Sequence, residues 1–293
     1  MFPPRGIYAV PLAHGGVLQL GHRPLVMGIL NVTPDSFAEA QPLMTPASAP
    51  DRAIATALRM EADGADLIDV GGESTRPGAE PVSAEEEIAR ILPVVEGLRG
   101  RLQIPLSVDT YKSAVADAAL RAGAAMVNDV SGLLYDPDLA AVVVARGAAL
   151  VLMHTRGRPK AMYGEAEYQD VIAEVAAELQ ACVARATAAG VPVDRILVDP
   201  GLGFAKRPVH SYGVLARLPE IAAALNRPVL VGPSRKSFMR DAAGGRAAAQ
   251  RDWTTAAAVT AAVFGGAHVV RVHAVAEMVQ VVRTAEAIRR AQD

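Results

Sequence analysis

The feature that most constrains the fold is the alternation of short apolar runs with longer segments of helical character. Eight apolar runs recur along the chain, at residues 25–30, 67–70, 106–108, 126–127, 149–153, 196–198, 229–231 and 268–272. Runs of this length separated by helical patterns are typical of repeated βα units, which build a parallel sheet. Because eight such strands close a barrel, the pattern predicts the α/β class and a TIM-type (β/α)8 barrel.

The chain is predicted to form a single domain over residues 1–293. One α/β barrel commonly takes about 250 residues, so this length suits a barrel without a second domain. The Gly- and Pro-rich stretch at 71–81 is too short to act as a spacer between domains. Residues 1–24 precede the first barrel strand, and we expect them to add a short strand or hairpin over the barrel floor, turning at His14, Gly15 and Gly16.

Composition excludes several classes of partner. The chain is 51% hydrophobic and 20% charged, which is typical of a globular protein and not of a disordered one. Its formal net charge of −2, without local basic clusters, predicts no nucleic-acid partner. The most apolar long window, 255–270, is rich in Ala, Thr and Gly, which favours a packed helix followed by a strand over a membrane span.

Two further features concern the compartment. Residues 1–10 contain two prolines and no apolar core of the length that a signal peptide needs, so we expect a cytoplasmic protein. The single cysteine, Cys182, excludes an intrachain disulfide. It lies on the apolar side of a helical pattern, and we expect it to be a buried small apolar residue.

Local signals predict where some helices begin and end. Ser83 and Glu86 form a capping-box pattern ahead of apolar residues at helical spacing. Pro93 lies inside that pattern, and we expect it to kink the helix or to end its first part. Asp252 is expected to open the helix that follows it.

Polar side chains follow almost every apolar run, at the point where the strand should end. They are Asn31, Glu73, Ser74, Thr75, Arg76, Asp109, Asn128, Asp129, His154, Asp199, Ser234, Arg235, Lys236, Arg271 and His273. Taken singly, such a residue can cap the next helix or lie on the surface. Their repetition at the same register favours a shared site, because the C-terminal ends of barrel strands meet at the rim where barrel active sites lie.

The residue types at this rim point to a polar ring held beside an anionic group. Asp109, Asn128 and Asp199 supply acceptors for a ring rich in N–H groups. The positive pole consists of Arg76, Arg235, Lys236, Arg271 and His273. Arginine side chains bind phosphate or diphosphate in a forked geometry, and a divalent metal would stabilise the departing oxygens.

The amino-acid sequences of these segments resemble the signature motifs of the dihydropteroate synthase family. The matching segments are MGILNVTPDSF at 27–37, DVGGESTRPG at 69–78, SVDT at 107–110, NDVSG at 128–132, DPGLGF at 199–204, SRK at 234–236 and RVH at 271–273. The resemblance runs from about residue 25 to the C-terminus, and the first two segments are long enough to be highly specific. It implies a TIM-type barrel, and substrates that are a dihydropterin diphosphate and p-aminobenzoate.

The resemblance also implies a role for individual residues. Pterin binding is implied for Asp109, Asn128, Asp199 and Lys236, with Met153, Phe204 and Gly232 shaping the slot. Asn31 would ligate the Mg²⁺ that accompanies the diphosphate, which Arg271 and His273 would hold. The p-aminobenzoate pocket would be formed by Thr75, Arg76, Pro77 and Ser237, and Arg235 is counted among the substrate-binding cations. The implied assembly is a homodimer through the last barrel helices, including residues 254–264.

The sequence departs from the family pattern in two places. The first loop usually continues after Phe37 with Ser-Asp-Gly-Gly, whereas this chain has Ala38, Glu39, Ala40 and Gln41. Glu39 is expected to replace the loop aspartate as a catalytic carboxylate, although the two lost glycines change the backbone freedom of the loop. Ala274 stands where an acidic residue normally follows the RVH triplet.

Two other functions compete with synthase activity. The first is a non-catalytic pterin-binding paralogue, and the feature of the sequence that supports it is the altered first loop. A pterin-dependent methyltransferase would share the Asp and Asn contacts to the pterin. The segment 74–77 and the pair Arg271 and His273 suit a diphosphate and a second aromatic substrate better than a corrinoid partner.

Overall fold

The computed structural model describes residues 2–33, 49–74, 78–158, 164 and 166–291. Within these ranges eight parallel strands run side by side in the order β8-β7-β6-β5-β4-β3-β10-β9. A parallel bridge between Val198 and Val229 brings the two ends of this sheet together. The strands are β3 (Leu25–Asn31), β4 (Leu67–Gly71), β5 (Leu106–Asp109), β6 (Met126–Asp129), β7 (Ala149–Met153), β8 (Ile196–Asp199), β9 (Leu230–Val231) and β10 (Val269–Val272). The predicted (β/α)8 barrel is confirmed.

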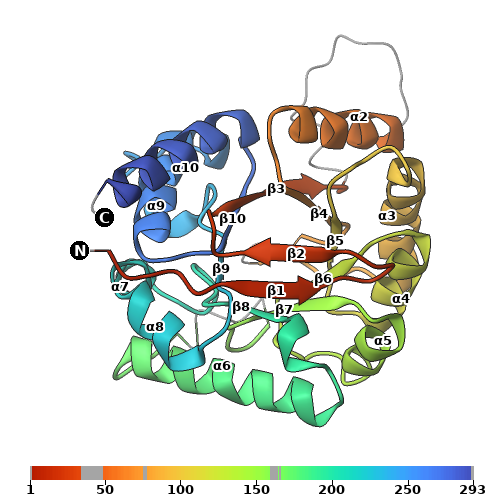
Figure 1. Cartoon of the computed structure of the whole chain (residues 1–293), viewed down its shortest axis with the longest axis horizontal. Coiled ribbons are helices and arrows are strands. Elements are labelled where there is room, and N and C mark those ends of the chain that lie inside the picture. Colours follow the sequence, from red (N-terminus) through yellow and green to blue (C-terminus); the bar gives the residue numbers. More distant parts are fainter. Residues whose placement is uncertain (1, 34–48, 75–77, 159–163, 165, 292–293) are drawn as a thin grey trace.

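Helices alternate with the strands and surround the barrel (Figure 1). They are α2 (Ala49–Ala62), α3 (Ala84–Leu98), α4 (Ser113–Ala122), α5 (Leu139–Arg146), α6 (Val171–Ala188), α7 (Pro208–Ala216), α8 (Leu218–Leu225), α9 (Asp252–Phe264) and α10 (Val275–Arg290). Among the described residues, short 3-10 helices lie in the connections at η2 (Val193–Arg195), η3 (Ser237–Met239) and η4 (Ala248–Gln250). No helix in the described part of the chain is long and apolar enough to cross a membrane.

The helix α3 shows how packing overrides local propensity. Ser83 caps it as predicted, because its side chain accepts a hydrogen bond of 3.2 Å from the backbone N–H of Glu86. Pro93 does not end it, and the helix continues to Leu98. An internal proline costs about 3 kcal/mol. Burial of Val94 and Leu98 beyond the proline contributes about 1.5–3 kcal/mol for each side chain, which offsets that cost.

The helix α9 begins at Asp252, as predicted, and the residue at its N-cap is Arg251, whose side chain makes no capping bond. The Asp252 carboxylate forms an ion pair with Arg235 at 2.7 Å. Cys182 on α6 is buried, as expected from its place in the helical pattern.

The N-terminal residues form a hairpin of β1 (Tyr8–Pro11) and β2 (Val17–Leu20), paired antiparallel. Its turn holds His14, Gly15 and Gly16 at φ values of 60°, 86° and 90°, in the region that favours glycine. Figure 1 shows the hairpin lying across the barrel. Its buried residues pack in one cluster with residues at the beginnings of the barrel strands. The hairpin therefore covers the N-terminal end of the barrel, and the opposite rim carries the chemistry.

Candidate active site

The last residues of neighbouring strands lie at one level of the barrel. The register pairs Asn31 with Gly71, Gly71 with Asp109, and Asp109 with Asn128. On the other side of the ring, Met153 pairs with Asp199. The side chains that follow the apolar runs are thus brought to a common rim, because parallel strands end together.

A charged cluster on this rim joins four strands. Arg271 on β10 donates from Nε to Asp69 Oδ2 and from Nη2 to Asp109 Oδ2, each at 2.6 Å. Asn128 on β6 donates from Nδ2 to the same Asp69 oxygen at 2.8 Å. This bond fixes the orientation of the amide, so Oδ1 of Asn128 is the atom left to accept a hydrogen bond from a ligand.

Asp69 on β4 is one of the residues that sequence reasoning missed. Its side chain is fully buried, and its Oδ1 has no hydrogen-bond partner among the described residues. Buried carboxylates are rarely left with an unpartnered oxygen, and when they are the cause is commonly a functional one. The signal in the sequence was the aspartate inside the otherwise apolar run 67–70.

Burial changes the proton affinity of Asp109. Removal from water raises the pKa of its carboxyl to about 7, with Arg271 opposing the shift and Asp69 adding to it. Asp109 therefore titrates near neutral pH. A carboxylate in this state is a strong acceptor for ring N–H groups.

A second charged group surrounds Gly232, which follows β9. A Cβ atom at this position would lie 3.7 Å from Arg271 Cβ and 3.9 Å from both Asp199 Oδ2 and Lys236 Nζ. Lys236 donates to the backbone carbonyl of Leu202 at 2.6 Å. Burial lowers the pKa of the Lys236 ammonium to about 8, and Asp199 opposes that shift. A side chain at position 232 would fill the space between these three charged groups.

An apolar wall lies next to the charges. Met153 is buried in a small cluster with Tyr111 and Val130, and Tyr135 and Phe204 pack against it. The rings of Tyr111 and Tyr135 meet edge to face at 5.1 Å, and Lys236 Nζ lies 4.6 Å from the centre of the Phe204 ring. A flat heterocycle needs such a surface beside its hydrogen-bonding groups. Sequence reasoning identified Met153 and Phe204 but missed the two tyrosines.

Comparisons with known proteins agree with this geometry. Residues 27–273 match the family model described as "Pterin binding enzyme". Dihydropteroate synthase from Synechocystis sp. is 43% identical over 99% of this chain and 96% of its own. The chain belongs to the dihydropteroate synthase family.

Solved structures of the family show the same fold. Xanthomonas albilineans dihydropteroate synthase with 4-aminobenzoic acid has a TM-score of 0.87 and 40% identity, covering 96% of this chain and 98% of that one. Burkholderia cenocepacia dihydropteroate synthase complexed with 7,8-dihydropteroate has a TM-score of 0.86 and 41% identity, covering 98% and 99%. Nearly the whole length of this chain is therefore shared with known dihydropteroate synthases.

The polar residues that follow β9 differ from one another in their contacts. Ser234 Oγ lies 2.9 Å from His273 Nδ1 and accepts from the His273 backbone N–H at 3.1 Å, which links the ends of β9 and β10. The guanidinium of Arg235 binds both carboxylate oxygens of Asp252, at 2.7 and 2.8 Å. Arg235 is thereby attached to α9, whereas Lys236 lies beside Asp199.

Several predicted residues lie outside the described residues: Glu39 in the first loop and Thr75, Arg76 and Pro77 in the second. The beginning of the second loop is described. Glu73 accepts from Tyr111 Oη at 3.0 Å and pairs with Lys112, which also bonds Glu87 at 2.6 Å. This network of α3 and α4 anchors the point where the second family loop leaves the barrel.

A cavity of about 540 Å³ lies between α10 and the start of β3. Four of the charged residues that line it are paired with each other, Arg23 with Asp66 and Arg290 with Glu286. None of the rim residues described above lines it. Because the active sites of TIM barrels lie at the C-terminal ends of the strands, we do not assign the active site to this cavity.

Proposed function

We propose that the chain condenses 6-hydroxymethyl-7,8-dihydropterin diphosphate with p-aminobenzoate, giving 7,8-dihydropteroate and diphosphate in folate biosynthesis. The observation that carries the proposal is the meeting of Asp109, Asn128, Asp199 and Lys236 at one rim. This rim lies in a chain that is 41% identical to a synthase solved with 7,8-dihydropteroate. The reaction is the transfer of a pterinylmethyl group.

The pterin is assigned to the side of the rim that combines acceptors with an apolar wall. Asp109, Asn128 and Asp199 would accept from the ring N–H groups, and each charge-assisted bond contributes about 1.5–3 kcal/mol. Lys236 would donate to a ring acceptor. Met153, Phe204 and Gly232 would shape the slot, and the close approach at Gly232 supports this assignment because a Cβ there would meet Asp199 and Lys236.

The diphosphate is assigned to Arg271 and His273. Asn31 would hold Mg²⁺, and its position at the end of β3 supports this, since it pairs in register with Gly71 on the same rim. The described residues contain no group of three His, Cys, Asp or Glu side chains that could form a metal cage. One protein oxygen together with substrate phosphates is a donor set that Mg²⁺ commonly uses. When bound, the metal would neutralise charge on the departing diphosphate.

p-Aminobenzoate is assigned to the opposite side of the slot. Ser237 begins the 3-10 helix η3, where its hydroxyl and the backbone N–H groups would face the carboxylate. Thr75, Arg76 and Pro77 would complete this pocket, and Arg235 is the further cation assigned to substrate binding.

The mechanism that these residues support is loss of diphosphate followed by attack of the neutral aromatic amine. Arg271 and His273 stabilise the negative charge that develops on the leaving group. Asp199, which is buried, and Asp109, whose side chain is 10% exposed, stabilise the electron-poor pterin ring. Glu39 is assigned as a carboxylate near that developing positive charge, and closure of the first two loops would exclude water from it.

The test is diphosphate release by the purified protein with dihydropterin diphosphate, Mg²⁺ and p-aminobenzoate. We expect turnover that depends on p-aminobenzoate and that is lost in Asp199→Asn. Tight pterin binding without turnover would overturn the proposal and identify a non-catalytic paralogue with an altered first loop. Methyl transfer from a methylated pterin to a corrinoid would identify the methyltransferase alternative.

We further propose a cytoplasmic homodimer. Trp253 at the start of α9 is 85% exposed, and Val209 on the neighbouring α7 is 69% exposed. Exposed large apolar side chains on adjacent helices are typical of subunit interfaces. We expect a dimeric mass in light scattering and a monomeric mass for Trp253→Lys. A wild-type monomer would contradict the proposed dimer.

A further inference from the structure

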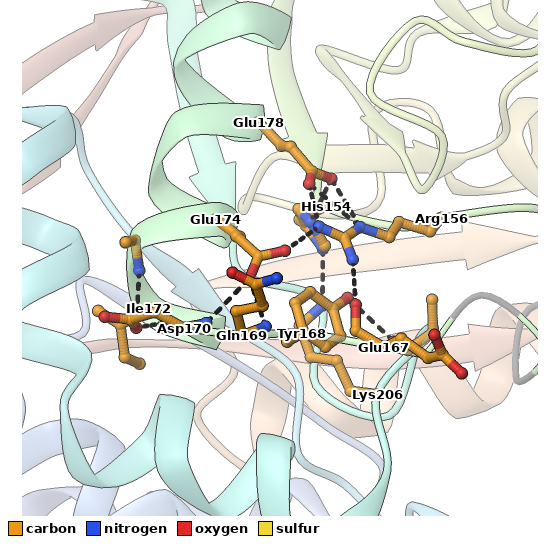
Figure 2. Close-up of polar contacts among 12 residues, drawn as sticks. His154, Arg156, Glu167, Tyr168, Gln169, Asp170, Ile172, Glu174, Glu178 and Lys206 are labelled. Carbon is orange, nitrogen blue, oxygen red and sulfur yellow. Dashed lines mark hydrogen bonds and ion pairs between the residues drawn. The ribbon is translucent and has the colours of Figure 1, made fainter.

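A fully buried lysine lies directly beneath the loop that follows β8. The Lys206 side chain is 1% exposed, and its Nζ has three acceptors: His154 Nδ1 at 2.7 Å, Gly201 O at 3.1 Å and Phe204 O at 3.2 Å. Figure 2 shows Lys206 reaching up to the His154 ring from below. Burial lowers the pKa of Lys206 well below its usual value, and the charge of Asp199 opposes that shift. The three acceptors match the three N–H donors of a lysine ammonium, so this geometry favours the charged form.

The charges around His154 determine which atoms donate. Burial acts to raise the pKa of Glu178, but hydrogen bonds from His154 and Arg156 outweigh it and lower the pKa to about 2. Glu178 is therefore a carboxylate, and His154 Nε2, 3.0 Å from it, must donate. Burial and the charge of Lys206 lower the pKa of His154 to about 4, so the ring is neutral. The remaining nitrogen, Nδ1, can then only accept from Lys206.

The two carbonyls that Lys206 binds belong to the loop that builds one side of the proposed pterin slot. Gly201 donates its N–H to Asp199 Oδ1 at 2.7 Å. Leu202 accepts from Lys236, and Phe204 supplies the ring beside Lys236. Gly201, Leu202 and Phe204 therefore each contact Asp199 or Lys236, which are assigned to the slot.

This loop has a backbone that needs to be held in place. A Cβ at Gly201 would lie 1.9 Å from the carbonyl oxygen of His154, so the two chain segments are in direct contact. Ala205 has a φ of 46°, a left-handed conformation that costs an L residue roughly 1–2 kcal/mol. Such conformations persist where the surroundings enforce them, often at functional sites.

We propose that Lys206 is a positioning residue for the pterin site, which holds the loop 200–205 in register with Asp199 and Lys236 through the carbonyls of Gly201 and Phe204. His154 and Glu178 orient its ammonium. This inference rests on the proposed function. A role in stability alone does not explain the arrangement, because a buried charge is costly to desolvate and a well-packed apolar residue often replaces it without loss of stability.

The test compares Lys206→Met with a matched variant, Arg5→Met. Arg5 is also a buried cation that binds two backbone carbonyls and a glutamate, but it lies between the N-terminus and α10. Binding of dihydropterin diphosphate with Mg²⁺ is measured by calorimetry without p-aminobenzoate, and KM for p-aminobenzoate is measured separately. We expect Lys206→Met to weaken pterin binding by about tenfold or more with little change in KM for p-aminobenzoate, and Arg5→Met to change neither.

A second pair of variants keeps the test decisive if Lys206→Met does not fold. His154→Leu removes the acceptor of the Lys206 ammonium, whereas His154→Asn places an amide oxygen near the position of Nδ1. We expect weaker pterin binding in His154→Leu and recovery in His154→Asn. Equal pterin binding by both variants, or wild-type binding by Lys206→Met with only a lower melting temperature, would overturn the positioning role. Failure of the wild-type protein to bind the pterin would instead refute the proposed function.

Discussion

At the scale of single residues, the rim depends on carboxylates that contact protein groups as well as the proposed ligands. Asp69 bonds Arg271 and Asn128 through one oxygen, and Asp129 accepts from the backbone N–H groups of Ser131 and Leu133. Asp129 therefore stabilises its own turn, as a strand-end aspartate often does. Asp69 instead sets the positions of two residues that are assigned to substrates.

We expect Asp69→Asn to lower kcat/KM by about 10- to 100-fold, because it replaces the charged acceptor of two hydrogen bonds that are worth roughly 1.5–3 kcal/mol each. Steady-state kinetics with both substrates measures the effect. The matched control is Asp117→Asn on the outer helix α4, where the carboxylate pairs with Arg121 and Arg146. An equal loss in the two variants would show that Asp69 has no special connection to the site.

The pH dependence of pterin binding should reflect two partly buried groups, Asp109 and Lys236. The pKa of Asp109 is raised to about 7 and that of Lys236 is lowered to about 8. Binding requires the Asp109 carboxylate and the Lys236 ammonium, so affinity should fall below pH 7 and above pH 8. Calorimetric titration between pH 6 and 9.5 measures the loss of affinity at both ends of the range. The loss of affinity above pH 8 should be absent in Lys236→Met. An affinity that is constant across this range would contradict the assignment of both residues.

At the scale of elements, Lys112, the residue that precedes α4, joins α3 to the beginning of the second loop. Its ammonium lies between Glu73 and Glu87, and Glu87 is nearly fully buried. Burial raises the pKa of Glu87, and the hydrogen bond from Lys112 opposes that effect. Removing the cation would leave two carboxylates close together with little access to water.

We expect Lys112→Met to destabilise the protein by roughly 3–5 kcal/mol, the usual cost of breaking a buried ion pair on one side. Urea unfolding measures the change. Arg121→Met on α4, the helix that follows Lys112, removes a guanidinium that is 65% exposed and should change stability by less than about 1 kcal/mol. Similar unfolding midpoints for the two variants would mean that the Lys112 network does not stabilise this region.

At the scale of the whole molecule, two buried histidines lie at separate places in the barrel. His154 lies beneath the rim, and His268 precedes β10, where its ring bonds the N–H of Val229 and the carbonyl of Gly6. Burial, as the largest cause, lowers the pKa of both to about 4. Both are neutral in the folded protein at pH values where the unfolded chain begins to protonate them.

The free energy of unfolding should therefore fall on acidification. The stabilising contribution of each histidine is complete above the unfolded pKa of 6.5 and is lost as the pH falls from there to about 4, by up to roughly 3 kcal/mol each. Urea unfolding at pH 7.5 and pH 5.0 measures the change, and His268→Gln should reduce it. His22→Gln, at an exposed position, serves as the control. Equal stability at the two pH values would contradict the burial of neutral imidazoles.

The amino-acid sequence by itself determined the barrel and the rim. Apolar runs of strand length, nearly all followed by polar residues, indicate buried strands that end in polar side chains. Because parallel strands end together, this repeated pattern is enough to bring Asn31, Asp109, Asn128 and Asp199 to one level. Family motifs then supplied the roles. Local signals were weaker where packing competes with them, as at Pro93, which lies inside a continuous helix.

Only the tertiary structure decided which side chains bond to one another. Asp69 and Arg271 lie far apart along the chain, as do His154 and Lys206, and no local pattern in the sequence relates the members of either pair. The partner of a buried charge depends on side-chain direction and on the closure of the ring between β8 and β9, which are properties of the assembled barrel. For this reason the roles of Asp69 and Lys206 follow from the placement of the strands and loops in space and not from the sequence.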